Sequence, residues 1–102
     1  MNKDFLGCVV TDGIDRFRKT NECYWIFSDV IAVVMTELKD EDFLNCVLRV
    51  KDNQAELIID DGNGNLLYSQ EYGYTDFPHE KVKFYAEKNE LGTFTLMFPE
   101  ER

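Results

Sequence analysis

Three segments between Phe43 and Tyr72 alternate apolar and polar residues, and this pattern constrains the fold more than any other feature of the sequence. In "FLNCVLRVK" (43–51), every second residue is apolar and falls on one face: Leu44, Cys46, Leu48 and Val50. A period of two is typical of a β-strand that buries one face. "AELIID" (55–60) and "LLYSQEY" (66–72) repeat the pattern, and "DGNGN" (61–65) supplies residues that accept positive φ in a hairpin. The segment therefore predicts a three-stranded antiparallel meander.

The segment before the meander has the spacing of helices. Apolar residues recur every three or four positions from Ile14 to Leu38, which is the period of an amphipathic helix. Thr11 or Asp12 can cap a first short helix, and the segment 20–22 marks a break before a second. The β-branched residues at 30–34 leave a strand open as an alternative. Length and period favour two helices.

The stretch "YGYTDFPHEKV" (72–82) gathers aromatic residues and the single histidine around a proline. Pro78 suits a first helical turn, where its missing N–H would be unpaired in any case. The sequence predicts a helix over 78–89, followed by a final strand over 93–98 that ends at Pro99. The expected fold class is α+β, with residues 1–102 forming a single domain. It has two N-terminal helices, the meander, one further helix and a final strand that joins a four-stranded antiparallel sheet.

Composition limits the classes of function. The 102 residues include 20 acidic and 11 basic side chains, for a net charge of −9. Such a charge argues against direct binding of nucleic acid or of an anionic membrane, and it permits docking on a protein partner with a basic surface. Solubility alone is an equally ordinary reason for it. The start of the chain does not resemble a secretory signal, and three widely spaced cysteines indicate free thiols, so we expect a cytoplasmic protein.

Motifs that carry chemistry are mostly missing. No glycine-rich phosphate loop is present, and three scattered cysteines with one histidine do not make a zinc site. Counted as a calcium loop from Asp61, the sequence has Leu66 where glycine is required and Tyr72 where glutamate is required. A Cys–His nucleophile pair would need His79, and no third orienting group can be named. The sequence therefore predicts no catalytic residue, no metal ligand and no cofactor.

Two groups of side chains are candidates for binding. The first is a pocket between helix and sheet, with candidate residues Trp25, Asp29, Tyr74, Asp76 and Phe77. Asp29 lies in an apolar helix one turn after Trp25, where a buried carboxylate would need a partner. The alternative is structural: a tryptophan in the core, an aspartate on a narrow wet face, and a strand-to-helix corner at 72–82.

The second group is an acidic surface for a basic partner. Its candidate residues are Asp40, Glu41, Asp42, Asp52, Glu56, Asp60, Asp61 and Glu71. Carboxylates spaced along strands can imitate a phosphate backbone and occupy a basic groove. A solvated polar face is the ordinary alternative.

Several of these motifs together resemble a family of small uncharacterised proteins from Bacteroides-type bacteria and their phages and mobile elements. The motifs are "TDG" (11–13), "CYWIFSDVI" (23–31), "DGNGN" (61–65), "YTDFP" (74–78) and the ending "LMFPEE". The family has no established activity, so the resemblance assigns no catalytic residues. It implies an accessory protein in the cytoplasm of a bacterial host.

This origin leads to a functional expectation. Small acidic phage proteins are often inhibitors of host defence, so we expect a non-enzymatic, anti-CRISPR-like protein that binds a nucleic-acid-handling complex through its acidic surface. The alternatives are a small-molecule or peptide-binding module, a metal-dependent enzyme that uses clustered carboxylates, and a protein that self-associates through a strand edge.

Overall fold

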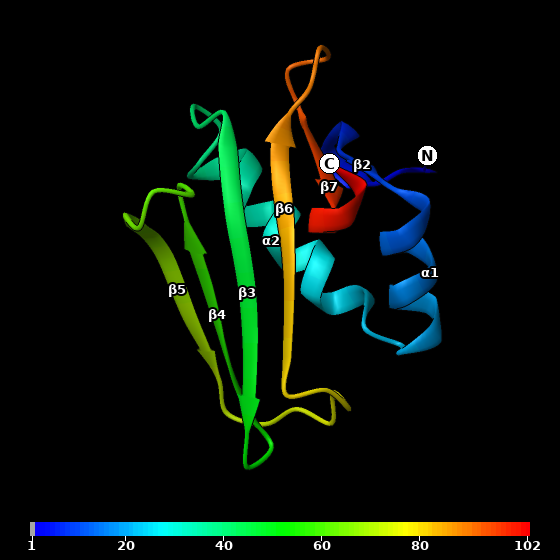
Figure 1. Cartoon of the computed structure of the whole chain (residues 1–102), viewed down its shortest axis with the longest axis vertical. Coiled ribbons are helices and arrows are strands. Elements are labelled where there is room, and N and C mark those ends of the chain that lie inside the picture. Colours follow the sequence, from blue (N-terminus) through cyan, green and yellow to red (C-terminus); the bar gives the residue numbers. More distant parts are fainter. Residues whose placement is uncertain (1) are drawn as a thin grey trace.

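The structure is a computed structural model that describes residues 2–102. It contains one mixed β-sheet with helices packed against it (Figure 1). The elements, in chain order, are β1 (Asn2–Lys3), the 3₁₀ turn η1 (Phe5–Gly7), β2 (Val9–Val10), α1 (Asp12–Thr20), α2 (Tyr24–Thr36), β3 (Phe43–Lys51), β4 (Gln54–Asp60), β5 (Leu66–Tyr72), β6 (Lys81–Lys88), β7 (Phe94–Met97) and the 3₁₀ turn η2 (Pro99–Glu101). The fold is therefore α+β, as the sequence predicts.

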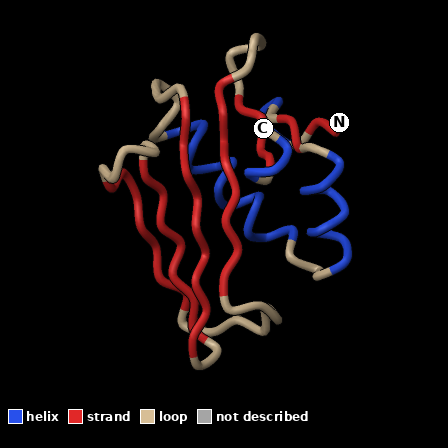
Figure 2. Tube along the Cα trace, viewed as in Figure 1, coloured by secondary structure: helices blue, strands red, loops and turns tan. Residues whose placement is uncertain are grey.

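The strands lie in the order β1-β2-β7-β6-β3-β4-β5 (Figure 2). β3 is central, since it pairs antiparallel with β4 on one side and with β6 on the other. The predicted meander is present as β3, β4 and β5, and the "DGNGN" hairpin joins the last two of these strands. A sheet of four antiparallel strands was expected, and this part of the prediction is wrong because β2 pairs parallel with β7.

The segment 78–89, expected to be a helix, forms strand β6 instead. Val82, Phe84 and Ala86 are buried, and the residues between them face away from the core, so the period here is two. β6 forms a ladder of seven residue pairs with β3, whose edge would otherwise be unpaired. A lone helix of this length is marginal in water, so the ladder prevails over the local helical signal. Pro78 lies in the loop before the strand.

The N-terminal strands β1 and β2 were not predicted. Each contains two residues, which is too short for an alternating pattern to be recognised. β2 is held by its parallel pairing to β7, with Val10 opposite Leu96. These two strands extend the sheet on the side opposite β5.

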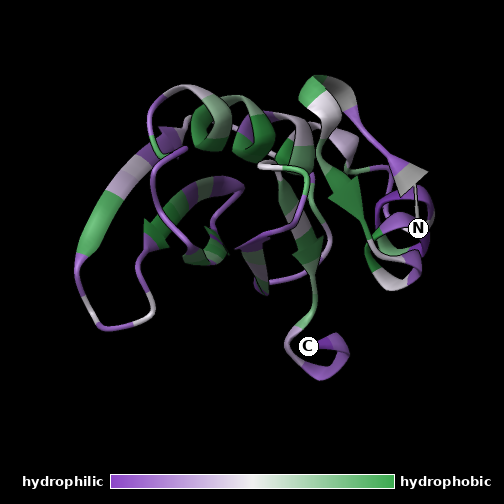
Figure 3. Ribbon diagram, turned by 90° about the horizontal axis from the view of Figure 1, so that it is seen from above, coloured by the Kyte–Doolittle hydropathy of each residue, from purple (hydrophilic) through white to green (hydrophobic). Residues whose placement is uncertain are grey.

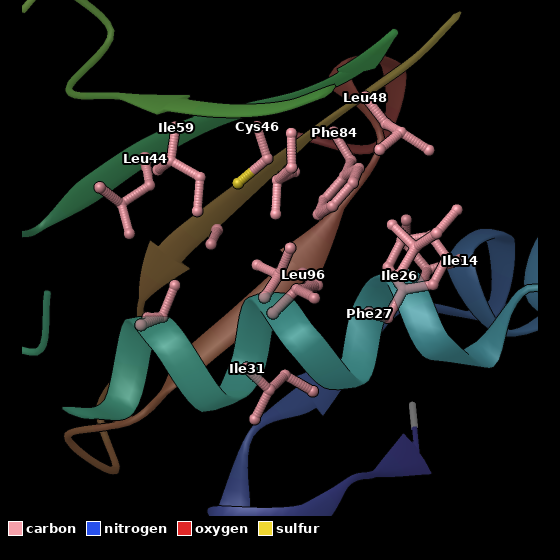
Figure 4. Packing of buried hydrophobic residues seen from close by; sticks show 14 of the residues in the cluster. Ile14, Ile26, Phe27, Ile31, Leu44, Cys46, Leu48, Ile59, Phe84 and Leu96 are labelled. Atoms are coloured by element: carbon pink, nitrogen blue, oxygen red, sulfur yellow. The ribbon is translucent and has the colours of Figure 1, made fainter. Parts of the chain in front are cut away.

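The two helices form as predicted, and α2 packs along one face of the sheet (Figure 4). The Thr11 hydroxyl caps α1 by accepting a 3.3 Å hydrogen bond from Ile14 N. Phe27 of α2 meets Phe84 of β6, with ring centroids 4.8 Å apart. Residues of α2 that are buried against the sheet and its neighbours are Ile26, Phe27, Val30, Ile31 and Val34. This packing, rather than the weak helix propensity of its β-branched residues, accounts for α2.

The three cysteines are free and buried, as expected for small apolar residues: Cys8, Cys23 and Cys46. Burial raises the pKa of the Cys46 thiol well above its usual value and raises that of Cys23 to about 11. The thiols are therefore protonated and unreactive near neutral pH. Within residues 2–102, no helix is long and apolar enough to cross a membrane.

Candidate functional site

Three connections meet at one end of the sheet, the upper end in Figure 1. They are the α2–β3 connection (37–42), the β4–β5 hairpin (61–65) and the β6–β7 hairpin (89–93). The register brings them together, since Asn45 pairs with Asp60 and Phe43 pairs with Glu87. Figure 3 looks at this end and shows its loops mostly in the hydrophilic colour.

Acidic residues predominate on these connections. We call the group the acidic end; its members are Glu37, Asp40, Glu41, Asp42, Asp60, Asp61 and Glu90. Two lysines accompany them. Lys88 donates from Nζ to the Lys39 carbonyl, and its backbone N–H donates to the Asp42 carbonyl at 2.8 Å. Five of the eight residues predicted for an acidic surface therefore lie at this end, and carboxylates far outnumber the two lysines.

Asp60 and Asp61 also shape the hairpin. Asp60 Oδ1 accepts a 2.7 Å hydrogen bond from Gly62 N. Asp61 Oδ1 accepts from the backbone N–H groups of Asn63 and Asn65, at 2.8 and 3.2 Å, and Oδ2 accepts from the Asn65 amide at 2.7 Å. The hydrogen bonds from Asn65 and Asn63 hold the pKa of Asp61 below its usual value. The spacing that resembles a calcium loop therefore belongs to a turn in which the carboxylates of Asp60 and Asp61 accept hydrogen bonds from backbone N–H groups.

The other three predicted acidic residues lie at the opposite end of the meander. Asp52 is in the β3–β4 turn with a φ of 54°, and Glu56 is the direct partner of Glu71 on β5. They line a shallow groove of about 660 Å³ together with two basic residues of β3, Arg49 and Lys51. The expectation of one acidic surface is therefore corrected. The structure divides it into an acidic end and a groove of mixed charge.

The five pocket candidates also separate into two places. Asp29 of α2 accepts a 2.8 Å hydrogen bond from the Tyr72 hydroxyl, and Trp25 meets the edge of the same ring at 5.1 Å. Burial and the nearby carboxylate raise the pKa of Tyr72 well above its usual value. Trp25 and Asp29 thus contact β5 through Tyr72, a residue that the sequence reasoning left out. The alternation of "LLYSQEY" places Tyr72 on the inward face of the strand, and this pattern could have identified it as a contact of the helix.

Tyr74, Asp76 and Phe77 do not join this contact. Tyr74 is 73% exposed and Asp76 is exposed. Phe77 is buried and packs against Phe17, with ring centroids 6.1 Å apart, and against His79 at 5.4 Å. The predicted pocket between helix and sheet is therefore not assembled from these five residues.

A buried ion cluster near the N-terminus was missed by the sequence reasoning. Arg18 is 6% exposed and donates from Nε and Nη2 to Asp15 Oδ1 at 3.0 and 2.9 Å. It also donates to Asp4 and lies over the Tyr24 ring, 4.7 Å from its centroid. The i, i+3 spacing of Asp15 and Arg18 was a visible signal, but the burial was not. The cluster joins α1 to the segment before it and holds no nucleophile.

His79 makes only structural contacts. It stacks on Phe17 at 5.8 Å, and its Nε2 lies 2.9 Å from Asn21 Oδ1. In the described part of the chain, no three His, Cys, Asp or Glu side chains are grouped so as to hold a metal ion.

Comparisons with curated proteins and with solved structures gave no match. The resemblance drawn from the sequence motifs starts at Thr11, whereas the match to a family model begins eight residues earlier. That model is described as a family of unknown function, DUF6876, and it spans residues 3–102. With almost its whole length matched, the chain belongs to this family of unknown function.

Proposed function

We propose that the protein is a non-enzymatic binding protein that docks its acidic end on a basic surface of a partner protein. The observation that carries the proposal is the convergence of seven carboxylates, six on neighbouring connections and Asp60 at the end of β4, accompanied by Lys39 and Lys88. Connections at the end of a sheet are held by strands, so they present side chains with little loss of order on binding.

The proposed partner is a protein that handles nucleic acid, such as a host defence complex. Such proteins line their grooves with lysine and arginine to neutralise phosphates, and a cluster of carboxylates complements the same groove. An origin in phages or mobile elements, expected from the resemblance, belongs to this proposal. The protein would then act by occupying the groove and excluding the nucleic acid.

Salt dependence follows from the mechanism. Exposed charges are screened beyond about 8 Å at physiological ionic strength, and more strongly at higher salt. We expect a partner to bind the acidic end more weakly as salt rises, mostly because association and rebinding become slower.

The test is a pull-down from bacterial host lysate with the tagged protein, washed at low and at high salt. D40K/D42K changes two exposed residues of the acidic end. D76K/E80K makes the same change in charge at two exposed residues that precede β6, at the opposite end of the sheet. The proposal predicts one stoichiometric partner that binds nucleic acid, is lost with D40K/D42K or high salt, and is kept by D76K/E80K.

Two outcomes would contradict the proposal. In the first, a partner is retained equally by D40K/D42K and by the unchanged protein, which would move binding away from the acidic end. In the second, retention does not respond to salt, which would exclude docking through exposed charges. In either case, ligand screening by thermal shift would test the small-molecule alternative.

A further inference from the structure

One face of the sheet points away from α2. We call it the outer face, made by the alternate side chains of β5, β4, β3 and β6 that do not enter the core. Its middle is apolar: Val47 of β3 is 9% exposed, although it points away from the core, and Ile58 of β4 pairs directly with it. At the upper end, Arg102 lies over the rings of Phe43 and Tyr85. Within residues 2–102, neither α1 nor α2 covers this face of the sheet (Figure 1).

Charge is sorted by strand over part of the outer face; nearer the upper end, β6 also carries Glu87, which pairs with Arg102. One row crosses the four strands as direct partners in the order Glu71, Glu56, Arg49, Lys81. Two acids therefore stand on the β5–β4 half and two bases on the β3–β6 half. Lys83 extends the basic half in the next row, opposite Val47.

This arrangement costs stability within one chain. Like charges that face each other across strands are unfavourable, and the row contains two such pairs, Glu56–Glu71 and Arg49–Lys81. Among the described residues, no ion pair within 4.0 Å includes any of these four side chains. The charges of the row are thus available to a partner whose charges run in the reverse order.

A second copy of this chain provides that reverse order. A two-fold axis parallel to the strands, between β3 and β4, turns the row around and faces it towards itself. Glu71 then lies over Lys81 of the second copy, and Glu56 lies over its Arg49. At the centre, Val47 lies over Ile58 of the second copy, and Ile58 lies over its Val47. A two-fold axis across the strands would place acids over acids, so the charges select the first arrangement.

We infer that the outer face is the interface of a homodimer in which two sheets pack face to face around this axis. Such a contact is isologous, so each ion pair occurs twice. Sheets packed in this way lie about 10 Å apart, with strand directions within about 30° of each other. The axis keeps both acidic ends on the same side of the dimer, although the inference does not depend on the proposed function.

The experiment measures the association state by sedimentation velocity over a range of protein concentrations. The unchanged protein is expected to dimerise reversibly. R49E places a carboxylate over Glu56 of the second copy, and E56R places a guanidinium over its Arg49. Because like charges brought together at an interface repel each other, each variant alone should dimerise at least about tenfold more weakly. Circular dichroism confirms that each variant is folded.

Mixing R49E with E56R is the decisive measurement. In the mixed dimer, every introduced charge faces an opposite charge, so an equimolar mixture should recover the dimer. A merely structural effect of either substitution would not be rescued. K39E and E90R make the same changes of charge at the acidic end and should dimerise like the unchanged protein.

A protein that stays monomeric at all concentrations would overturn the inference. So would a dimer that persists in R49E and E56R alone, which would point to pairing through a strand edge such as β5. Both outcomes leave the proposed function standing, because that proposal is tested separately, by D40K/D42K and by the salt dependence of partner binding.

Discussion

The hydroxyl of Tyr72 on β5 donates a 2.8 Å hydrogen bond to Asp29 Oδ2 of α2, 43 residues earlier in the chain. It joins the helical layer to the last strand of the meander, while Trp25 packs against the edge of the same ring. Trp25 and Asp29, two of the five residues that the sequence suggests for a binding pocket, therefore form a contact that fixes α2 on the sheet.

Y72F tests this contact because it removes the hydroxyl and keeps the ring. We expect the free energy of unfolding to fall by about 1 kcal/mol, the usual net value of one hydrogen bond. Y72A also removes the ring against Trp25, so its loss should be about 3 kcal/mol. Urea denaturation measures both. No loss for Y72F would show that the hydroxyl contributes nothing, and equal losses for the two variants would show that the ring contributes nothing beyond the hydroxyl.

The same pair predicts a response to alkaline pH. The pKa of Tyr72 is raised in the folded protein, first by burial and then by Asp29, so its contribution is fully present below the unfolded value of about 10. It is lost as pH rises through the folded pKa, because the unfolded state ionises first. The difference in stability between the unchanged protein and Y72F should be constant up to about pH 9 and shrink above pH 10. A difference that grows in that range would contradict the assignment.

Arg18 should be the most costly charged residue to remove. R18M removes the buried cation that pairs with Asp15 and Asp4, and breaking such an ion pair costs about 3 kcal/mol. Lys19 also pairs with Asp15, at 2.8 Å, but its side chain is exposed. K19M is therefore the matched control, and it should cost far less than R18M because solvent screens an exposed ion pair. Similar losses for R18M and K19M in thermal unfolding would refute a special role for burial.

Acid should remove the advantage of the Arg18 cluster. Hydrogen bonds from Lys19 and Arg18 lower the pKa of Asp15, so the stabilisation is present above its unfolded value of about 3.8. It is lost as pH falls through the still lower folded pKa. The gap in stability between the unchanged protein and R18M, followed by urea denaturation, should hold from pH 7 to about pH 5 and begin to narrow below about pH 4. A gap that does not narrow at all below pH 4 would rule out the carboxylate as the partner.

The two glycines of the β4–β5 hairpin should differ in their tolerance of alanine. Both have positive φ, 85° at Gly62 and 90° at Gly64, so either substitution strains the backbone by about 1 kcal/mol. A Cβ at Gly62 would also lie 3.0 Å from the Phe43 ring, whereas at Gly64 nothing lies within 4 Å. G62A should therefore lower the melting temperature more than G64A. The reverse order would contradict the packing of Phe43 against the hairpin.

The meander could be predicted from the sequence because its signals are local. Alternation in 43–51, 55–60 and 66–72 defines the buried face of each strand, and the glycines of "DGNGN" permit the turn. The two helices are equally local, since their apolar residues follow the helical period. These features depend on residues only a few positions apart.

The remaining features depend on pairing between distant segments. The segment 78–89 has both a helical and an alternating reading, and only the open edge of β3 selects the strand. Register alone sets Arg49 beside Lys81 and separates Asp52, Glu56 and Glu71 from the acidic end. A composition with 20 acids is visible in the sequence, but its distribution over the surface is not. The sequence by itself determined the elements whose signals are local, whereas the tertiary structure decided which charges meet, because cross-strand neighbours are set by hydrogen-bonded ladders between segments far apart in the chain.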